Sequence, residues 1–280
     1  LRIFDPEVLV KDFRQLGLAE GDEKIWREMI GQPHGIILVT GPTGSGKTTT
    51  LYSTLKQLAT PEVNVCTIED PIELVETRFN QMQVNPAINL NFADGVRALL
   101  RQDPDIIMVG EIRDLETAEV AVQAALTGHL VLSTLHTNDA PSAVTRLLEL
   151  GIPPYLLKAT LLGVVAQRLL RTLCKHCKKP VAVSAEHWQE AGGSLPPPKQ
   201  IYAAQGCLEC RETGYYGRAG IYEMLRVTPA FTAAIREDVD SPHIKATAVK
   251  DGMRSLRIGA LAMVAAGTTS LAEAASMTPP

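Results

Sequence analysis

Short runs rich in apolar residues alternate with stretches of helical periodicity through the first 173 residues of the chain. The runs have the length of buried strands, and they cover residues 36–39, 64–68, 81–85, 105–110 and 129–136. Between most of them, apolar residues recur every three or four positions, which is the spacing of an amphipathic helix. This alternation predicts an α/β fold with a largely parallel, helix-covered sheet over residues 35–173.

The same pattern predicts the helices and divides the rest of the chain. Helices are expected from residue 49 onward and over residues 93–101, 116–126, 139–150 and 154–173. Residues 1–34 mix short helical repeats with turn residues and form a lead-in to the core at 35–173. Residues 174–214 contain paired cysteines, and residues 215–280 contain one strand followed by Ala-rich helices. We therefore expect a cysteine-containing subdomain and then a small C-terminal subdomain, in which the helices form a bundle.

A glycine-rich loop follows the first predicted strand. Residues 41–48 match G-x-x-x-x-G-K-[S/T] at every fixed position, between a strand and a helix, which is the context in which this motif binds phosphates. Backbone N–H groups and the positive end of the helix dipole face the phosphates. Lys47 would reach the outer phosphates, and the Thr48 hydroxyl would bind Mg²⁺. The predicted nucleotide-binding residues are Gly41, Pro42, Thr43, Gly44, Ser45, Gly46, Lys47, Thr48 and Thr49.

Polar side chains mark the ends of three further predicted strands. Glu69 and Asp70 follow the second strand, Glu111 follows the fourth, and His136 ends the fifth. The carboxyl ends of parallel strands meet at one edge, where ligands bind. In a phosphate-loop ATPase an acid there holds Mg²⁺ or orients the attacking water. The usual residue is Asp, so Glu111 leaves the choice between these roles open. His136 can reach a γ-phosphate, whereas His129 lies at the opposite strand end and is assigned to packing.

Four of the five cysteines form two C-x-x-C pairs with 29 residues between them (178–206). Each pair can deliver two sulfurs to one ion, so the pattern favours a structural Zn²⁺ over redox chemistry or an iron–sulfur cluster. The predicted ligands are Cys174, Cys177, Cys207 and Cys210. The Gly- and Pro-containing spacer is expected to be loop-rich. Cys66 is expected to be a packed thiol, and His176 is left out because four thiolates complete the site.

The composition narrows the class of protein. The chain has 280 residues, of which 45% are hydrophobic and 21% charged, as in a globular protein of one or two domains. A net charge of −4 gives no general reason to expect nucleic-acid binding. No apolar run reaches the roughly 18 residues of a membrane span, and the N-terminus lacks the pattern of a signal peptide. We expect a cytosolic protein, and the missing initiator Met indicates a fragment.

Four motifs in this order resemble those of the type II secretion and type IV pilus assembly ATPase family (GspE/PilB-type). They are a Walker A loop at 41–48, an aspartate box at 67–73, a Walker B segment at 101–114 and a histidine box at 128–138. The four-cysteine segment is similar to that of the family's assembly ATPases. The 29-residue spacer and residues 161–174 look closer to the type II secretion branch than to the pilus branch.

The resemblance implies a RecA-like domain that hydrolyses ATP with Mg²⁺ at the subunit interfaces of a homo-hexamer. It would drive assembly of a pseudopilus or pilus on the cytoplasmic side of the bacterial inner membrane. Platform proteins would bind through N-terminal domains that precede this chain. By matching position, Glu111 is the catalytic acid, Glu69 lies in the aspartate box, and His136 senses the phosphates. The arginines that match those around the nucleotide and the subunit interface are Arg97, Arg101, Arg113 and Arg218.

Two other functions stay open at this point. A RecA-like nucleic-acid motor would use the cysteine segment as a DNA contact through Lys175, Lys178 and Lys179, although no aromatic residues are interleaved for base stacking. A non-catalytic module gated by nucleotide would bind ATP tightly without releasing phosphate. We predict a peripheral ATPase with no direct membrane span and no nucleic-acid partner.

Overall fold

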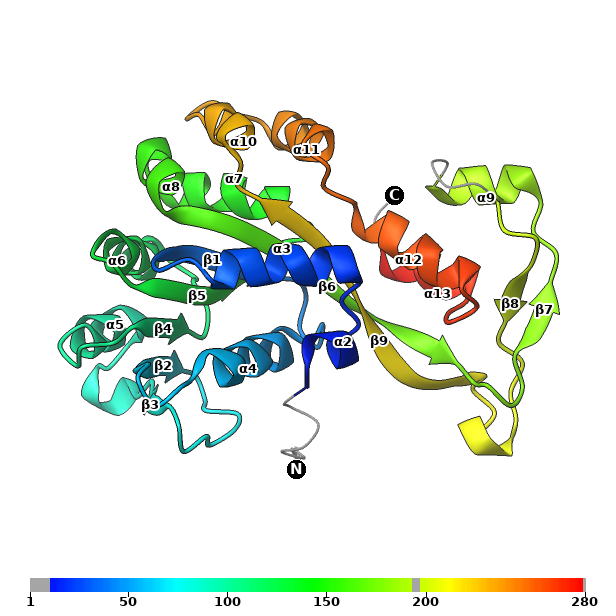
Figure 1. Cartoon of the computed structure of the whole chain (residues 1–280), viewed down its shortest axis with the longest axis horizontal. Coiled ribbons are helices and arrows are strands. Elements are labelled where there is room, and N and C mark those ends of the chain that lie inside the picture. The colour runs from blue at the N-terminus through cyan, green and yellow to red at the C-terminus, as the bar shows by residue number, and fades with distance from the viewer. Residues whose placement is uncertain (1–10, 193–196, 279–280) are drawn as a thin grey trace.

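The computed structural model describes residues 11–192 and 197–278, so the first ten residues of the predicted lead-in lie outside the described residues. Figure 1 shows one large sheet with helices on both sides, from which two long strands reach a small outlying unit. The helices are α2 (Phe13–Leu16), α3 (Glu20–Ile30), α4 (Lys47–Leu58), α5 (Phe92–Leu99), α6 (Leu115–Leu126), α7 (Pro141–Leu150), α8 (Pro154–Thr160), α9 (Ala185–Gly192), α10 (Pro229–Ala234), α11 (Ser241–Lys250), α12 (Leu256–Ala265) and α13 (Leu271–Met277). The strands are β1 (Gly35–Thr40), β2 (Val65–Glu69), β3 (Asn80–Gln83), β4 (Ile106–Val109), β5 (Leu130–Leu135), β6 (Leu161–Leu173), β7 (Lys179–Val181), β8 (Ile201–Ala203) and β9 (Tyr215–Arg226).

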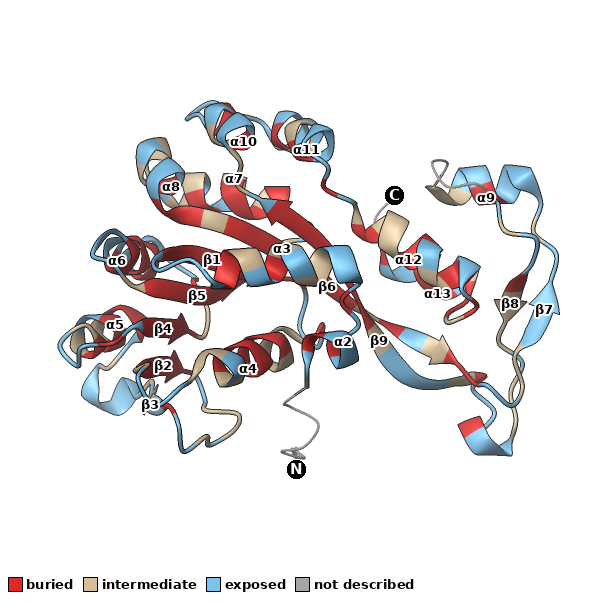
Figure 2. Cartoon of the chain, in the orientation of Figure 1, coloured by how far each residue is buried: buried red, intermediate tan, exposed pale blue. Residues whose placement is uncertain are grey.

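The main sheet has seven strands in the order β3-β2-β4-β5-β1-β6-β9. All neighbouring pairs are parallel except β6 and β9, which confirms the predicted mostly parallel sheet. The strands β1, β2, β4 and β5 are buried along their whole length, as Figure 2 shows. Parallel strands covered by helices on both faces read as continuous apolar runs, which is why these four could be recognised in the sequence.

The prediction of a helix over residues 154–173 is wrong. Helix α8 ends at Thr160, and residues 161–173 form β6, which pairs with β1 on one side and β9 on the other. Periodicity cannot separate a buried strand from a buried helix in such an apolar run, so tertiary pairing decides. Gly163 allows the close packing, because a Cβ atom there would lie 2.2 Å from the sulfur of Met29.

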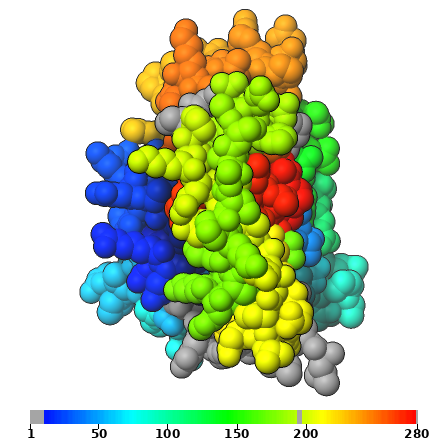
Figure 3. All heavy atoms as spheres, turned by 90° about the vertical axis from the view of Figure 1, so that its right-hand side faces the viewer, coloured from blue at the N-terminus to red at the C-terminus, as the bar shows by residue number. Residues whose placement is uncertain are grey.

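The spacer between the cysteine pairs contains more regular structure than its composition predicts. Strands β7 and β8 form an antiparallel ladder, and helix α9 precedes the second of them. Trp188 on α9 is 1% exposed and belongs to the same apolar cluster as Leu261 on α12. Figure 3 views the molecule from the side of the small outlying unit, which lies in front of the C-terminal helices. An aromatic anchor therefore holds the spacer against the C-terminal helices.

The C-terminal segment extends the core. Strand β9 is the edge strand of the main sheet, so the expected division at residue 215 does not coincide with a boundary of that sheet. Helices α10 and α11 pack near α7, whereas α12 and α13 pack against β9 and β6. The expected terminal bundle is thus two helix pairs that cover different parts of the fold. Within the described ranges, no helix is long and apolar enough to cross a membrane.

Candidate nucleotide-binding site

The phosphate-binding loop connects β1 to α4 at the carboxyl edge of the sheet. The hydroxyl oxygen of Thr40, at the end of β1, lies 2.7 Å from that of Thr137. Gly41 follows with φ 147°, and a Cβ atom there would lie 2.5 Å from the carbonyl oxygen of Gln167. Gly46 has φ 90°, and its Cβ would lie 2.8 Å from Nε2 of the same residue. Only glycine fits these two positions, because the loop lies directly against β6.

Lys47 and Thr48 form the first turn of α4. The Lys47 ammonium group donates hydrogen bonds to the carbonyl oxygens of Gly41, at 2.8 Å, and Pro42, at 3.1 Å. Burial lowers the pKa of Lys47 from its usual value, and the neighbouring Glu111 carboxylate offsets part of this effect. A partly desolvated cation beside a helix N-terminus is suited to binding phosphate oxygens.

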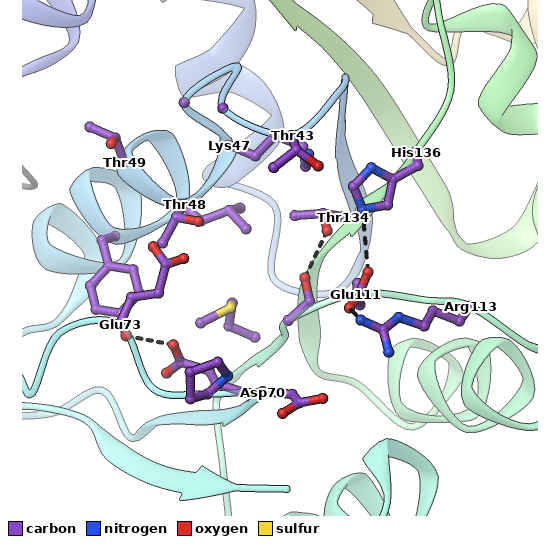
Figure 4. A pocket seen from close by; sticks show the side chains of 18 of the residues that line it. Thr43, Lys47, Thr48, Thr49, Asp70, Glu73, Glu111, Arg113, Thr134 and His136 are labelled. Atoms are coloured by element: carbon purple, nitrogen blue, oxygen red, sulfur yellow. Dashed lines mark hydrogen bonds and ion pairs between the residues drawn. The ribbon is translucent and has the colours of Figure 1, made fainter. Parts of the chain in front are cut away.

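One cavity of about 660 Å³ opens between the loop and the ends of β2, β4 and β5 (Figure 4). The predicted site residues that line it are Thr43, Gly44, Gly46, Lys47, Thr48, Thr49, Glu69, Glu111, Arg113, His136 and Arg218. Gly41, Pro42 and Ser45 complete the loop. Among the described residues, the Ser45 hydroxyl is the buried side-chain group that has no hydrogen-bond partner. The structure therefore brings the loop together with the polar ends of three strands.

Glu111 lies between two basic side chains in this cavity. Nε2 of His136 is 3.3 Å from Oε2 of Glu111, and Arg113 forms an ion pair with Oε1. The Glu111 side chain is 15% exposed, whereas those of His136 and Arg113 are more than half exposed. The Thr134 hydroxyl donates to the Gly110 carbonyl at 2.7 Å and fixes the backbone just before the carboxylate.

Glu69 lines the same cavity but is bonded to other protein groups through both oxygens. Oε2 accepts a hydrogen bond from the Tyr52 hydroxyl at 2.6 Å, and Oε1 accepts one from Thr67 at 2.6 Å and one from Gln81 at 3.2 Å. Burial, and then the contact with Glu69, raise the pKa of Tyr52, so the phenol remains the donor. Asp70 lies beside Glu69 at the cavity wall and is exposed. Glu69 is thus held in place by α4 and β3.

The four predicted arginines do not all reach the cavity of a single chain. Arg113 and Arg218 line it. Arg97 is 47% exposed and bonds to Asp94 at 3.0 Å and Glu116 at 2.9 Å on the outer surface. Arg101 is exposed and lies outside the lining. Within one chain, Arg97 and Arg101 are therefore surface groups.

Three polar residues around the site were not singled out from the sequence. Tyr52 bonds to Glu69, Gln167 bonds to the phosphate-binding loop, and Arg168 donates to the Asn138 carbonyl at 2.9 Å just after His136. Burial lowers the pKa of Arg168. The sequence feature that could have marked Gln167 and Arg168 is their position as two adjacent polar residues within an otherwise apolar run. His129 is partly buried and lies outside the cavity lining, with Nδ1 2.8 Å from the Ala124 carbonyl oxygen.

The four predicted cysteine ligands form a cluster in which the sulfur atoms lie within 4.8 Å of one another. The distances Cys174–Cys207 and Cys177–Cys210 are 3.8 Å, and Cys207–Cys210 is 3.7 Å. Burial opposes ionisation of Cys210, but the backbone N–H groups of Cys207 and Gly214, each 3.2 Å from its sulfur, help to lower its pKa to about 6. Cys66 lies apart in β2, and burial raises the pKa of its thiol.

The fold and the cavity define an α/β protein with a phosphate-binding loop of the Walker A type. The chain belongs to the family described as type II/IV secretion system protein, whose model matches residues 1–276.

Relatives from both branches of this family are similar to the chain. It is 58% identical over 281 residues to the type IV pilus assembly ATPase TfpB of Acinetobacter baylyi, covering 100% of this chain and 48% of that protein. It is 49% identical over 282 residues to the type II secretion system ATPase E of Vibrio cholerae, covering 99% and 55%. The chain therefore spans about half the length of these curated relatives.

The fold is also similar to a solved structure, that of the pilus retraction motor PilT with bound ADP. The TM-score is 0.72 and the identity 32%, over 97% of this chain and 68% of that one.

Proposed function

We propose that the chain is the ATP-hydrolysing region of a motor that assembles a type II secretion pseudopilus or a type IV pilus at the bacterial inner membrane. The observation that carries this proposal is the single cavity in which the phosphate-binding loop, Glu111 and His136 converge. The names of the relatives, which are secretion and pilus assembly ATPases, supply the biological context.

Each side chain of the cavity has a separate role in the proposed hydrolysis. Lys47 and the N-terminus of α4 bind the phosphates, and His136 contacts the outer phosphate from the end of β5. Glu111 orients the attacking water or accepts its proton, because its carboxylate lies 3.3 Å from His136 and is the acid that most strongly affects the Lys47 ammonium group. Mg²⁺ would neutralise phosphate charge, and the Thr48 hydroxyl and the Glu111 carboxylate are oxygen donors that could hold it. This assignment supports Mg²⁺-dependent turnover.

Assembly into a homo-hexamer would complete the site. The cavity of one chain contains the carboxylates of Glu69, Asp70, Glu73 and Glu111, so a bound triphosphate needs further cations. We assign Arg97 and Arg101 to the subunit interface, where exposed guanidinium groups could reach the nucleotide of a neighbour. The resemblance to the family supports this arrangement, together with platform-protein partners and a peripheral position on the cytoplasmic side of the inner membrane.

We further propose that the four cysteines bind a structural Zn²⁺ in a subdomain at residues 174–214. A tetrahedral site with metal–sulfur bonds of about 2.3 Å has sulfur–sulfur edges of about 3.8 Å. The closest sulfur–sulfur distances, 3.7 and 3.8 Å, fit this edge and far exceed a disulfide of about 2.05 Å. Four sulfur donors also favour Zn²⁺ over Mg²⁺ or Ca²⁺.

The choice between the two branches rests on different observations. The cysteine spacer and residues 161–174 favour type II secretion, whereas the 58% identity to TfpB favours type IV pilus assembly as a second candidate. Deleting the gene separates them: loss of secreted enzymes with normal pili supports secretion, and loss of surface pili with normal secretion supports pilus assembly.

A nucleic-acid motor is less well supported. Of the three lysines near the cysteines, Lys178 is engaged within the chain, because its ammonium group donates to the Gly267 carbonyl at 2.7 Å and lies 4.5 Å from the centre of the Tyr202 ring. ATP hydrolysis stimulated by single-stranded DNA, and unaffected by a secretion-platform fragment, would favour the motor instead.

Replacing Lys47 with alanine tests the proposed nucleotide site. Loss of a charge-assisted contact to phosphate, worth about 1.5–3 kcal/mol, should weaken ATP binding by roughly 10- to 150-fold. The measurement is the affinity for a fluorescent ATP analogue in the presence of Mg²⁺, with the exposed Lys158→Ala variant as the control. Wild-type binding and turnover by Lys47→Ala would reject the assignment, as would turnover in the wild type that is unchanged by chelation of Mg²⁺.

A further inference from the structure

We propose that Gln167 is a positioning residue that holds the phosphate-binding loop in its nucleotide-binding shape. The proposal rests on the proposed function, since it concerns the same loop. Gln167 lies on β6 and is 1% exposed. It is 117 residues away in sequence from one of its partners, Thr50.

The Gln167 amide connects the two ends of the turn that leads into α4. Its Nε2 donates to the carbonyl oxygen of Ser45 at 2.9 Å, and its Oε1 accepts a hydrogen bond from the Thr50 hydroxyl at 2.8 Å. Ser45 belongs to the loop and Thr50 to the first turns of the helix. One side chain therefore directs the carbonyl of Ser45 toward β6 and links it to the helix that begins at the end of the loop.

The contact is closely fitted on the loop side. A Cβ atom at Gly46 would lie 2.8 Å from Nε2 of Gln167, so the amide rests against the backbone of the residue before Lys47. A buried amide that lost one of these partners would leave an unsatisfied polar group. Both hydrogen bonds of the Gln167 amide therefore form only when the phosphate-binding loop has this conformation.

Further buried hydrogen bonds hold Thr50, the partner of Gln167 on α4, in place. The Thr54 hydroxyl donates to the carbonyl oxygen of Thr50 at 2.7 Å, and the Trp26 indole N–H donates to the Thr54 hydroxyl at 3.1 Å. Trp26 is 1% exposed on α3. A chain of buried hydrogen bonds thus runs from α3 through α4 to Gln167, and the loop carbonyl is its last member.

Strand alternation makes this role specific to position 167. Successive side chains of a strand point to opposite faces, and the next residue, Arg168, donates to the Asn138 carbonyl on the histidine-box side. Val165 and Leu169 share the face of Gln167, but neither carries a side-chain group that can hydrogen-bond to Ser45 and Thr50. Because Gln167 has no place among the residues lining the cavity, it acts on nucleotide through the loop.

The test compares Gln167→Leu with Thr160→Val in the full chain. Both remove a buried hydrogen-bonding group, since Thr160, the last residue of α8, is 2% exposed and donates to the Leu156 carbonyl of the same helix at 2.7 Å. Gln167→Leu should weaken ADP binding at least tenfold and raise the KM for ATP, whereas Thr160→Val should leave both within twofold. The melting temperature without nucleotide should fall to a similar extent in both variants.

A third variant covers the case in which Gln167→Leu does not fold. Gln167→Glu keeps the acceptor that faces Thr50 but places a carboxylate oxygen opposite the Ser45 carbonyl, so it too should weaken ADP binding about tenfold. A folded variant of either kind with wild-type ADP affinity, or a loss of affinity equal to that of Thr160→Val, would overturn the proposal. A wild type that binds no ADP would instead overturn the proposed function itself.

Discussion

Glu111→Gln is expected to slow ATP hydrolysis by about 10²- to 10⁴-fold, the usual contribution of a positioned general base, while ADP affinity changes by only a few fold. Glutamine keeps the size of the side chain and can still contact His136, which lies 3.3 Å away. It cannot accept a proton from water or balance the positive charge of Arg113. The loss should therefore fall on kcat, and the loop that binds the phosphates should be unaffected.

The measurement is single-turnover phosphate release alongside binding of a fluorescent nucleotide. Glu119→Gln is the matched control, because Glu119 is an exposed residue on α6 away from the cavity. Its turnover should equal that of the wild type. If Glu111→Gln hydrolysed ATP at the wild-type rate, the proton-accepting or water-orienting role would have to pass to another acid of the cavity. If its ADP affinity fell together with kcat, Glu111 would be a binding group.

The strands that carry the site could be predicted because their burial shows in the sequence. Residues 36–39 and 106–109 are apolar throughout, and a glycine-rich loop or an acid follows each at the same sheet edge. Because each follows the carboxyl end of a predicted parallel strand, Lys47, Glu111 and His136 could be predicted to lie at the same edge of the sheet. Their mutual distances depended on side-chain packing, which no local pattern contains.

Contacts between distant segments could not be predicted in the same way. Residues 161–173 carry an apolar run compatible with either helix or strand, and their pairing with β1 and β9 decides the outcome. Because the sequence predicts a helix over residues 154–173, it does not predict the contact of Gln167 with Ser45. Arg97 and Arg101 are a different case: a family motif matched them, and nothing in one chain brings them to the nucleotide.

The remaining large effect is expected at the four cysteines. Structural Zn²⁺ in small sites binds with an apparent free energy of about 10–16 kcal/mol at neutral pH, and this energy is also folding energy. Within the described part of this unit, the buried apolar side chains of the ladder and of α9 are Ile201 on β8 and Trp188 on α9. Cys207→Ser, which removes one of four ligands, should therefore reduce zinc from one ion per chain to a small fraction and unfold residues 174–214.

The loss should spread into α13, which is bonded together with the loop before it to the strand that leads into the cysteine site, and into α12, which packs against α13. Arg171 on β6 forms paired hydrogen bonds with Glu273 on α13, at 2.9 and 2.6 Å, and the Leu173 N–H donates to the Thr268 carbonyl at 2.8 Å. Hydrogen exchange should accelerate there in Cys207→Ser and remain slow in β1 and β5. Cys66→Ala, which removes the cysteine outside the cluster, should keep one zinc ion per chain and slow exchange in both regions. Protein without metal, with four reactive thiols and wild-type exchange at residues 174–214, would show that packing alone folds this unit.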